Sequence, residues 1–452
     1  MRTVVERYNL LYRIGVLLLM LALGLICYGL ALSSWNTPVE LGAYDVLLRM
    51  RPAQTIRNDI VILAIDAPAV AELGPLPWSR ATHARILRAL QEAGARYIVY
   101  DMLFPQPDTE RPGADRAFWR AMTLREDAFL PMIYDPFKEP EWDPADLRGL
   151  ILLERFVQTR RITYTSDTPM YKYYYFSPPW ADFVSAARGV GTAVTSSNVS
   201  PVVRQAQLAS LTKVEYPVPS QPLPRTIPSP KLMDQTAVAP GLPLLVAQAV
   251  MEVEKDLTEV DFGDSIAFLA DLQPYVRIPI DDAGRMVINY AGPVGSYPYH
   301  SAIDLLEDRL DPALLDDKIV FVGITGAMDT LSSTVRTPFG YMPRVEATAN
   351  STATILDRSY ISRTRQDALA AILVLAIILG LLLAAVPRLD LAPTGFVLSL
   401  AYIVVAVLAL TVFRHALPVM PALILALLGS AAAAFLKPVL FVSEEEVVIV
   451  EE

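Results

Sequence analysis

Two aspartates follow short apolar runs in the first third of the chain. Asp66 comes directly after DIVILAI and Asp101 directly after YIVY, and both runs are typical of buried β-strands. At the carboxyl ends of adjacent parallel strands, where open α/β sheets bind ligands, such carboxylates could hold a cation or polar ligand or carry acid–base chemistry. The simpler interpretation is that both accept hydrogen bonds from the following turn or helix. Trp78 could form an aromatic wall of the same crevice or anchor a loop to the core.

A glycine-bearing turn later in the chain is a further candidate. Gly323-Ile324-Thr325-Gly326 follows the strand-like run KIVFV, and its backbone amides could cradle an anion. The predicted ligand-binding residues are therefore Asp66, Trp78, Asp101, Gly323 and Thr325.

The remaining chemistry-bearing residues are few. No Gly-x-Ser-x-Gly elbow occurs, and no histidine lies in a motif that specifies a nucleophile's base, so we expect no enzyme activity. One cysteine and three histidines cannot form structural zinc or iron–sulfur sites or an intrachain disulfide. We predict no catalytic residue, metal or cofactor. Cys27 is expected to be buried and inert.

The composition indicates a membrane protein. Of 452 residues, 53% are hydrophobic and 19% are charged, whereas ordinary soluble domains have about 25% charged residues. The formal net charge of −10 makes nucleic acid a poor partner.

The apolar excess is concentrated in four charge-free runs. The first, 14–32, follows Arg2, Arg7 and Arg13, which places the N-terminus in the cytoplasm; a cleaved signal peptide is the alternative. Small residues such as Gly429 and Ser430 in the last run would let helices approach closely. The predicted organisation is a cytoplasmic N-terminus (1–13), a transmembrane helix (14–32), an extracytoplasmic domain (33–366), three transmembrane helices (367–386, 394–413 and 416–436) and a cytoplasmic acidic tail (437–452).

The region between the first and second apolar runs predicts an α/β domain with a partly parallel sheet. Strands at 59–65 and 97–100 flank a helix from 80 to about 93 that Ser79 caps, which together form a βαβ unit. A helix at 115–122 and a strand at 128–134 follow. Later, strands at 286–290 and 318–322 resume the sheet, with a helical stretch at 303–306 between them and a helix at 345–356 after them. The proline-dense segment 214–243 predicts an extended surface loop.

Several stretches together resemble a known family. Early ones are Ala43-Tyr44-Asp45 with Arg49, IVILAIDAPAVAELGPLPWSR and GARYIVYDMLFPQPD; late ones are IPIDDAGRMVINYAGP, LLDDKIVFVGIT and TPFGYMPRVEATANS. Their order, with the three trailing helices, is similar to the second type of CHASE domain, a cyclase/histidine-kinase-associated extracellular sensory domain of bacterial receptors. The turn SPVVR at 200–204 departs from the family's Asp-Gly-Val-Val-Arg-like turn, which puts a ligand role of that turn in doubt.

The resemblance implies a sensor that passes a signal to a cyclase or kinase. After Lys437 only PVLFVSEEEVVIVEE follows, so we expect a longer protein or a separate partner to supply that output. We expect a multi-pass homodimer in the plasma (inner) membrane, with both termini cytoplasmic, that binds an unidentified extracytoplasmic ligand. Two alternatives stay open: a structural or assembly subunit of a cell-envelope complex, and an extracytoplasmic enzyme that uses Asp66 and Asp101.

Overall fold

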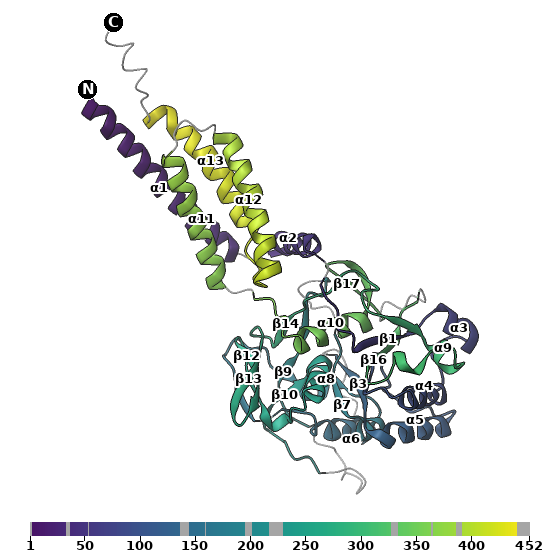
Figure 1. Ribbon diagram of the computed structural model, residues 1–452. Helices are drawn as coiled ribbons and strands as arrows, with labels where there is room; N and C mark the ends of the chain where they lie inside the picture. The colour runs from purple at the N-terminus through teal and green to yellow at the C-terminus, as the bar shows by residue number, and fades with distance from the viewer. Residues whose placement is uncertain are drawn as a thin grey trace. The chain divides into compact units, whose positions relative to one another are not determined.

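The chain forms two compact units. The computed structural model describes residues 2–32, 37–52, 54–135, 144–158, 160–194, 201–216, 229–326, 333–362, 365–385 and 391–440. One unit joins Met1–Pro52 to Ile361–Glu452, and the other is Ala53–Tyr360 (Figure 1). The acidic run of the predicted C-terminal tail lies outside the described residues.

The unit Ala53–Tyr360 is built on a seven-stranded, mostly parallel sheet. Its strands run in the order β15 (Tyr299–Ser301), β1 (Ile60–Ile65), β16 (Ile319–Ile324), β2 (Tyr97–Tyr100) and β3 (Ala128–Tyr134). Next to β3 lie β7 (Gly189–Thr192), which is parallel to it, and β6 (Phe176–Ser177), which is antiparallel. All six residues of β1 are buried, as expected for a parallel strand covered on both faces.

Helices cover both faces of this sheet. On one face, α4 (Arg80–Glu92) and α5 (Pro112–Arg125) bury Leu87 and Phe118 against Ile98 and Val320 of the strands. On the other face lie α8 (Leu242–Val250) and α10 (Arg344–Leu356). The Ser79 hydroxyl accepts a hydrogen bond from the Ala81 amide, which confirms the predicted cap of α4.

Smaller elements complete the unit. Three further sheets have the orders β10-β9-β5, β13-β12-β11-β4 and β14-β8, and a hairpin joins β17 to β18. The strands are β4 (Arg161–Thr163), β5 (Tyr171–Lys172), β8 (Gln205–Gln207), β9 (Ala209–Lys213), β10 (Thr236–Pro240), β11 (Thr258–Asp261), β12 (Ser265–Ala270), β13 (Gln273–Pro279), β14 (Arg285–Val287), β17 (Thr334–Thr337) and β18 (Gly340–Pro343). The helices are α3 (Ala67–Leu73), α6 (Pro144–Leu153), α7 (Ala181–Ala186) and α9 (Ala302–Leu306), with short 3-10 turns at Tyr173–Tyr175, Lys255–Leu257 and Pro312–Leu314.

The structure contains the predicted βαβ unit of β1, α4 and β2, but it corrects the expectation that the two strands are adjacent. β16, which is more than 200 residues later in the chain, is inserted between β1 and β2, so these two strands are parallel but not neighbours. The reason is that the apolar runs show which strands are buried but carry no information about their order across a sheet.

Two other predictions fail in the second half of the unit. The strand expected at 286–290 is β14, which pairs antiparallel with β8 and not with the main sheet; the strand that does join the main sheet is the short β15. The expected loop at 214–243 contains β10, which pairs with β9, and the beginning of α8. Pro240 ends β10, and Pro243 lies in the first turn of α8, where its missing N–H costs no helix hydrogen bond. Residues 217–228 of that segment lie outside the described residues.

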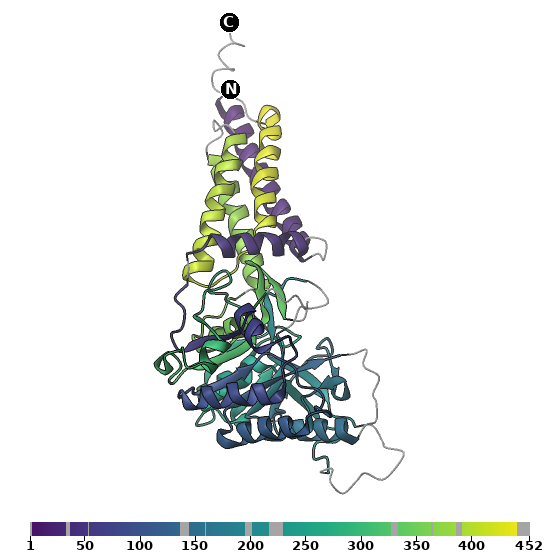
Figure 2. The ribbon, with the colours of Figure 1, turned by 90° about the vertical axis from the view of Figure 1, so that its right-hand side faces the viewer.

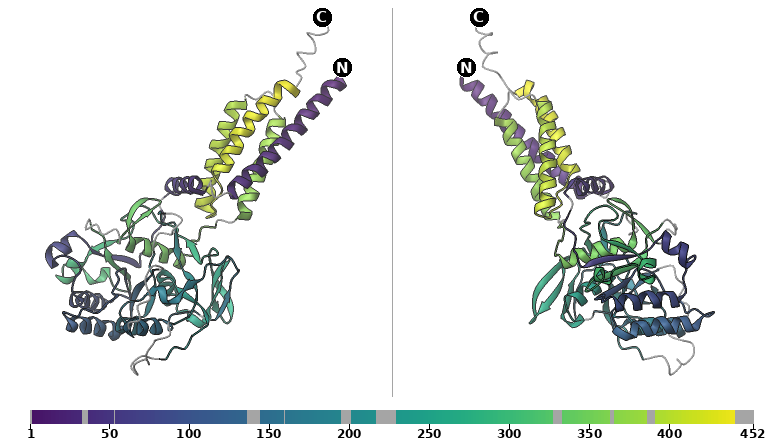
Figure 3. Two further views of the ribbon diagram at one scale, coloured as in Figure 1. Left: turned by 180° about the vertical axis from the view of Figure 1, so that it is seen from behind. Right: turned by 45° about the vertical axis from the view of Figure 1, so that its right-hand side comes forward.

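The other unit contains five helices among its described residues: α1 (Arg2–Leu32), α2 (Thr37–Met50), α11 (Arg365–Ala385), α12 (Leu391–Val412) and α13 (Met420–Leu440) (Figures 2 and 3). One face of α1 packs against α11 and α13 through Met20 and Cys27. Cys27 is a buried free thiol, as predicted. A Cβ at Gly429 would lie 2.8 Å from the Met20 sulfur, so this glycine permits close packing, as predicted.

Two helices in the described part of the chain are long and apolar enough to cross a membrane, judged by length and composition. The qualifying segments are Leu10–Gly29 in α1 and Gly395–Val412 in α12. The apolar parts of α11 and α13, Leu369–Ala384 and Met420–Phe435, are shorter. The number of C-terminal spans therefore stays a prediction.

Candidate functional site

The carboxyl edge of the main sheet brings together residues from four strands. Asp66 follows β1, Asp101 follows β2, Ser301 ends β15 and Thr325 follows β16. Asp66 caps α3: its Oδ1 accepts hydrogen bonds from the Ala69 amide at 3.0 Å and from the Ser301 hydroxyl at 2.7 Å. Its carboxylate therefore holds β1, α3 and β15 together, which is the simpler role that the sequence allowed.

The end of β16 lies directly against Asp66. The Thr325 amide donates to the Ile65 carbonyl at 3.1 Å, and a Cβ at Gly326 would lie 3.0 Å from the Ala67 nitrogen. Thr325 and Asp66 are half-buried at this edge. Residues 327–332, which continue the chain here, lie outside the described residues.

Gly323 has a different position from the one predicted. It lies inside β16, not in the turn that follows, because β16 continues to Ile324. A Cβ on Gly323 would come within 2.6 Å of the Val345 Cβ in α10. The glycine therefore allows α10 to pack closely on the sheet.

Asp101 forms a buried ion pair with Arg344, the first residue of α10. The Arg344 Nε lies 2.9 Å from Asp101 Oδ2. The Arg344 Nη2 also donates a hydrogen bond to the Asp101 carbonyl oxygen at 2.9 Å. Burial raises the pKa of the Asp101 carboxyl to about 6, while the Arg344 charge and its hydrogen bond act in the opposite direction. The pair connects β2 to α10.

α10 carries a row of buried polar side chains. Glu346, Asn350 and Thr354 follow one another at intervals of four residues, so they share one face of the helix. Glu346 accepts from the Ser296 amide at 3.0 Å and the Tyr299 hydroxyl at 2.7 Å. On the same face, Asn350 Oδ1 accepts a hydrogen bond from the Ala291 amide at 2.9 Å. Thr354 Oγ1 accepts one from the Asn289 amide at 3.1 Å.

These contacts attach α10 to the segment 289–299. Burial raises the pKa of the Glu346 carboxyl. The hydrogen bonds from the Tyr299 hydroxyl and from the backbone amides act in the opposite direction and lower the pKa. Every residue of α10 is buried. The helix therefore connects β2, β16 and the segment that leads into β15, and any movement of one of them changes contacts along α10.

Trp78 lies in an aromatic cluster of the core. It is 5% exposed, and its indole N–H donates to the Gly74 carbonyl at 2.8 Å. His83 lies among Trp78, Phe104 and Phe118, with ring centroids 5.2 Å apart for the pair His83 and Phe104. Burial, followed by the Arg80 charge, lowers the pKa of His83 to about 3, so the imidazole is neutral at pH 7.

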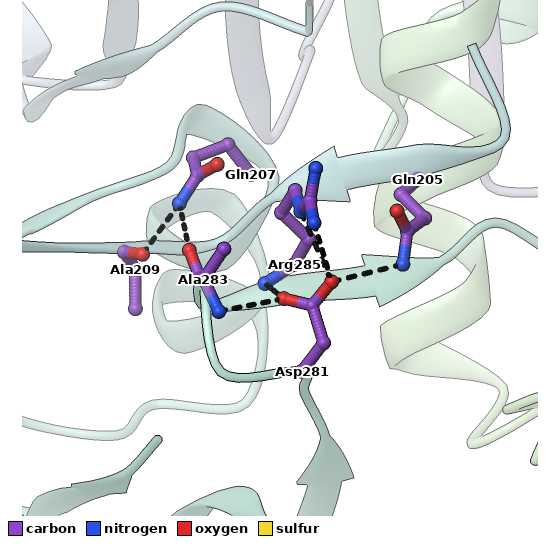
Figure 4. A network of polar contacts seen from close by, with 6 residues as sticks. All are labelled: Gln205, Gln207, Ala209, Asp281, Ala283 and Arg285. Atoms are coloured by element: carbon purple, nitrogen blue, oxygen red, sulfur yellow. Dashed lines mark hydrogen bonds and ion pairs between the residues drawn. The ribbon is translucent and has the colours of Figure 1, made fainter. Parts of the chain in front are cut away.

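A second polar cluster lies in the turn between β13 and β14 (Figure 4). Asp281 Oδ1 accepts from the Ala283 and Arg285 amides at 3.0 and 2.9 Å, and Oδ2 accepts from Gln205 Nε2 at 3.2 Å and Arg285 Nε at 3.0 Å. Gly284 has a φ of +75°, and a Cβ there would lie 2.0 Å from the Ala209 carbonyl oxygen. Asp281 thus closes the turn and fixes β14 beside β8, which is a structural role.

Within the described residues no group of three or more His, Cys, Asp or Glu side chains is placed to hold a metal ion. The charged groups at the sheet edge are instead paired with one another or with backbone amides.

The α/β unit lies in the chain between apolar helices, and polar side chains follow several strands at the carboxyl edge of its main sheet. A family model described as "CHASE2 domain" matches residues 17–386, and the chain belongs to this family. CHASE2 domains are extracellular sensory domains of membrane receptors, which confirms the resemblance. No curated protein and no solved structure matches the chain.

The sequence pointed to this edge but missed the residues that organise it. Arg344, Glu346 and Asn350 were part of the stretch TPFGYMPRVEATANS and were not singled out. The signal that could have found them is the four-residue spacing of Glu346, Asn350 and Thr354 among small residues, since polar side chains on one face of a helix need partners if that face is buried.

Proposed function

We propose that this chain is a membrane-anchored extracytoplasmic sensor that passes a signal through its C-terminal helices to a cytoplasmic output. The observation that carries the proposal is the CHASE2 match, which begins inside α1 and ends after α11 and so covers the α/β unit with an apolar helix on either side. In this proposal α1, α11, α12 and α13 each span the plasma (inner) membrane, with both termini in the cytoplasm. The positive charges of Arg2, Arg7 and Arg13 support that orientation.

The ligand or partner is proposed to bind at the carboxyl edge, at Asp66 and Thr325. Trp78, Asp101 and Gly323 would support the binding residues without contacting the ligand. Trp78 and Gly323 would do so through packing, and Asp101 through its pair with Arg344. A shift of β16 or β2 would change the contacts of α10, and eight residues of chain separate the end of α10 from the beginning of α11. Homodimerisation would suit this transmission, because two copies related by a two-fold axis can move between two arrangements.

The proposal includes no catalytic role for this chain. A cyclase or kinase output would belong to a longer protein or to a cytoplasmic partner. If Asp66 and Asp101 instead formed an enzyme active site, Asp66→Asn would abolish turnover, whereas in a sensor it shifts only binding or signalling.

The arrangement is tested by cysteine labelling in intact cells. In a Cys27→Ala background, Leu124→Cys places a thiol at a side chain of α5 that is 75% exposed. A membrane-impermeant maleimide applied to spheroplasts should label this cysteine without lysis, and Arg7→Cys should be labelled only after permeabilisation. Labelling of Leu124→Cys only after lysis would overturn the exported arrangement.

Ligand binding at the edge is tested by thermal-shift screening of the full chain with small polar metabolites. A compound that binds there should raise the melting temperature of the wild type and of Asp304→Asn, a control at a half-exposed carboxylate paired with Arg309. The same compound should have little effect on Asp66→Asn and Thr325→Val. A stable stoichiometric complex with envelope proteins, unchanged by every small molecule, would support a structural subunit instead.

A further inference from the structure

The helix α2, directly after the first apolar helix, has two faces that differ sharply. One face carries Glu40, Tyr44 and Leu47, which are buried within the unit that joins Met1–Pro52 to Ile361–Glu452. A separate face exposes Val39 by 53%, Val46 by 46% and Met50 by 56%. The spacing of seven and then four residues puts these three side chains in one stripe along the helix.

Glu40 ties α2 to the beginning of α13. Its Oε1 accepts from the Val419 amide and its Oε2 from the Met420 amide, both at 2.8 Å, although Glu40 is only 8% exposed. The carboxylate therefore satisfies amides that have no partner inside α13 and lies at the positive end of that helix. The two contacts are made by residues about 380 positions apart in the sequence.

This attachment places α2 crosswise to α12 and α13 (Figures 2 and 3). The exposed apolar surface of α12 includes Val404 and Val412 and ends with Phe413, which is 75% exposed. The polar residues Arg414 and His415 follow at once. α2 packs against α12 and α13 and is attached where α13 begins, so it lies at the level where the apolar surface of the helices gives way to polar residues.

We propose that α2 is an interfacial helix whose stripe of Val39, Val46 and Met50 contacts phospholipid at the boundary between headgroups and acyl chains. The inference rests on the proposed function, because it requires α12 to span the membrane. An amphipathic helix that lies in the membrane plane buries its apolar face at this depth. Arg49, exposed beside Met50, lies where a lipid phosphate can pair with it.

The size and surroundings of the stripe favour lipid over a second protein. Three side chains cover far less than the roughly 800 Å² per partner of a standard protein interface. α2 also packs against α12, whose exposed apolar surface faces lipid if α12 spans. Lipid contact at α2 would fix the depth of the first residues after α1, and Glu40 would transmit that position to α13.

The test measures the depth of α2 in a bilayer by fluorescence quenching. The full-length Cys27→Ala chain is labelled with an environment-sensitive fluorophore at Val46→Cys, Val404→Cys or Leu124→Cys and reconstituted into phosphatidylcholine vesicles. The quencher is phosphatidylcholine with a nitroxide either near the headgroup or near the end of the acyl chain. Val404 precedes Val412 by eight residues, so its label should lie deeper by about 12 Å.

The label at Val46 should be quenched more strongly by the shallow nitroxide, the label at Val404 more strongly by the deep one, and the label at Leu124 by neither. If the label at Val404 is quenched by the deep nitroxide but the label at Val46 behaves like the label at Leu124, the proposed interfacial position of α2 is wrong, whereas α12 still spans the membrane. If Val404 is not quenched by either lipid, the proposed function itself fails. Efficient disulfide formation between two copies of Val46→Cys would also overturn the proposal, because the stripe would then face protein.

Discussion

At the scale of single residues, the buried pair of Asp101 and Arg344 is the contact with the largest expected effect on stability. Both side chains are nearly inaccessible, with exposures of 3% and 11%. Removing one partner leaves the other charge buried without compensation. Asp101→Asn should therefore lower the free energy of unfolding by about 3–5 kcal/mol, measured by denaturant unfolding of the full chain in detergent.

Asp304→Asn is the matched control for this prediction. Asp304 also pairs with an arginine, Arg309, at 3.0 Å, but both side chains are half-exposed. Exposed pairs contribute about 0–1 kcal/mol, so this variant should unfold almost like the wild type. Equal effects of the two substitutions would show that burial does not set the strength of the Asp101 pair.

His83 predicts a second effect, on the pH dependence of stability. Its pKa is about 3 in the folded chain, against an ordinary value of 6.5, so the unfolded chain takes up a proton first as the pH falls. The stability due to a neutral His83 is fully present above pH 6.5 and is lost as the pH falls toward 3. The slope should approach about 1.4 kcal/mol per pH unit between these values.

His83→Phe removes the titrating group from the aromatic cluster. Denaturant unfolding at a series of pH values should show a shallower acid-side loss of stability for this variant than for the wild type. Parallel curves for the two proteins would mean that His83 is protonated without unfolding, contrary to its burial.

At the scale of elements, the distance between α10 and the main sheet depends on a glycine. Gly323→Ala would place a methyl carbon 2.6 Å from the Val345 Cβ, so β16 or α10 must move. We expect a loss of about 1–3 kcal/mol in the free energy of unfolding, as in other overpacked cores. Val345→Ala should recover part of that loss in the double variant, because the new methyl then has space.

Gly113→Ala provides the control for a glycine without such a neighbour. No atom lies within 4 Å of the Cβ it would gain, and Gly113 is in the first turn of α5. This substitution should be neutral or slightly stabilising. If Gly323→Ala were equally neutral, the close packing of α10 on β16 would not constrain the fold.

At the scale of the whole molecule, the unit Ala53–Tyr360 has its own core, and its two ends are joined. Arg57 pairs with Asp59 through Nε at 2.8 Å and with Asp357 through Nη1 at 2.8 Å, across 300 residues of sequence. We expect a fragment of residues 54–360 to fold by itself and to melt in one cooperative transition, measured by differential scanning calorimetry.

Arg57→Ala should lower the melting temperature of that fragment by about 2–4 °C, since the pair is partly exposed and the unit is large. Arg309→Ala, which removes an exposed ion pair of Asp304, is the control and should change it less. A fragment that aggregates or melts without cooperativity would show that the two units depend on each other to fold.

Several elements of the α/β unit are predictable from the sequence. The apolar runs at 59–65, 97–100 and 128–134 correspond to β1, β2 and β3, and the cap at Ser79 marks the beginning of α4. These features are local, because an apolar run and a helix cap are each formed by consecutive residues of the chain. The three-residue strand β15 was missed because it is too short to carry a pattern, and β10 was missed because prolines surround it.

Three features follow from the sequence alone: an α/β domain between apolar helices, the positions of Asp66 and Asp101 after parallel strands, and a resemblance to the CHASE2 family. Periodicity, hydropathy and motif order are properties of the chain, so they can be recognised without coordinates. The folded structure was needed to show that β16 lies between the strands of the two aspartates, that Asp101 pairs with Arg344 and that Glu40 of α2 caps α13. Each of these contacts joins residues more than 200 positions apart, and no local pattern specifies which distant segments meet.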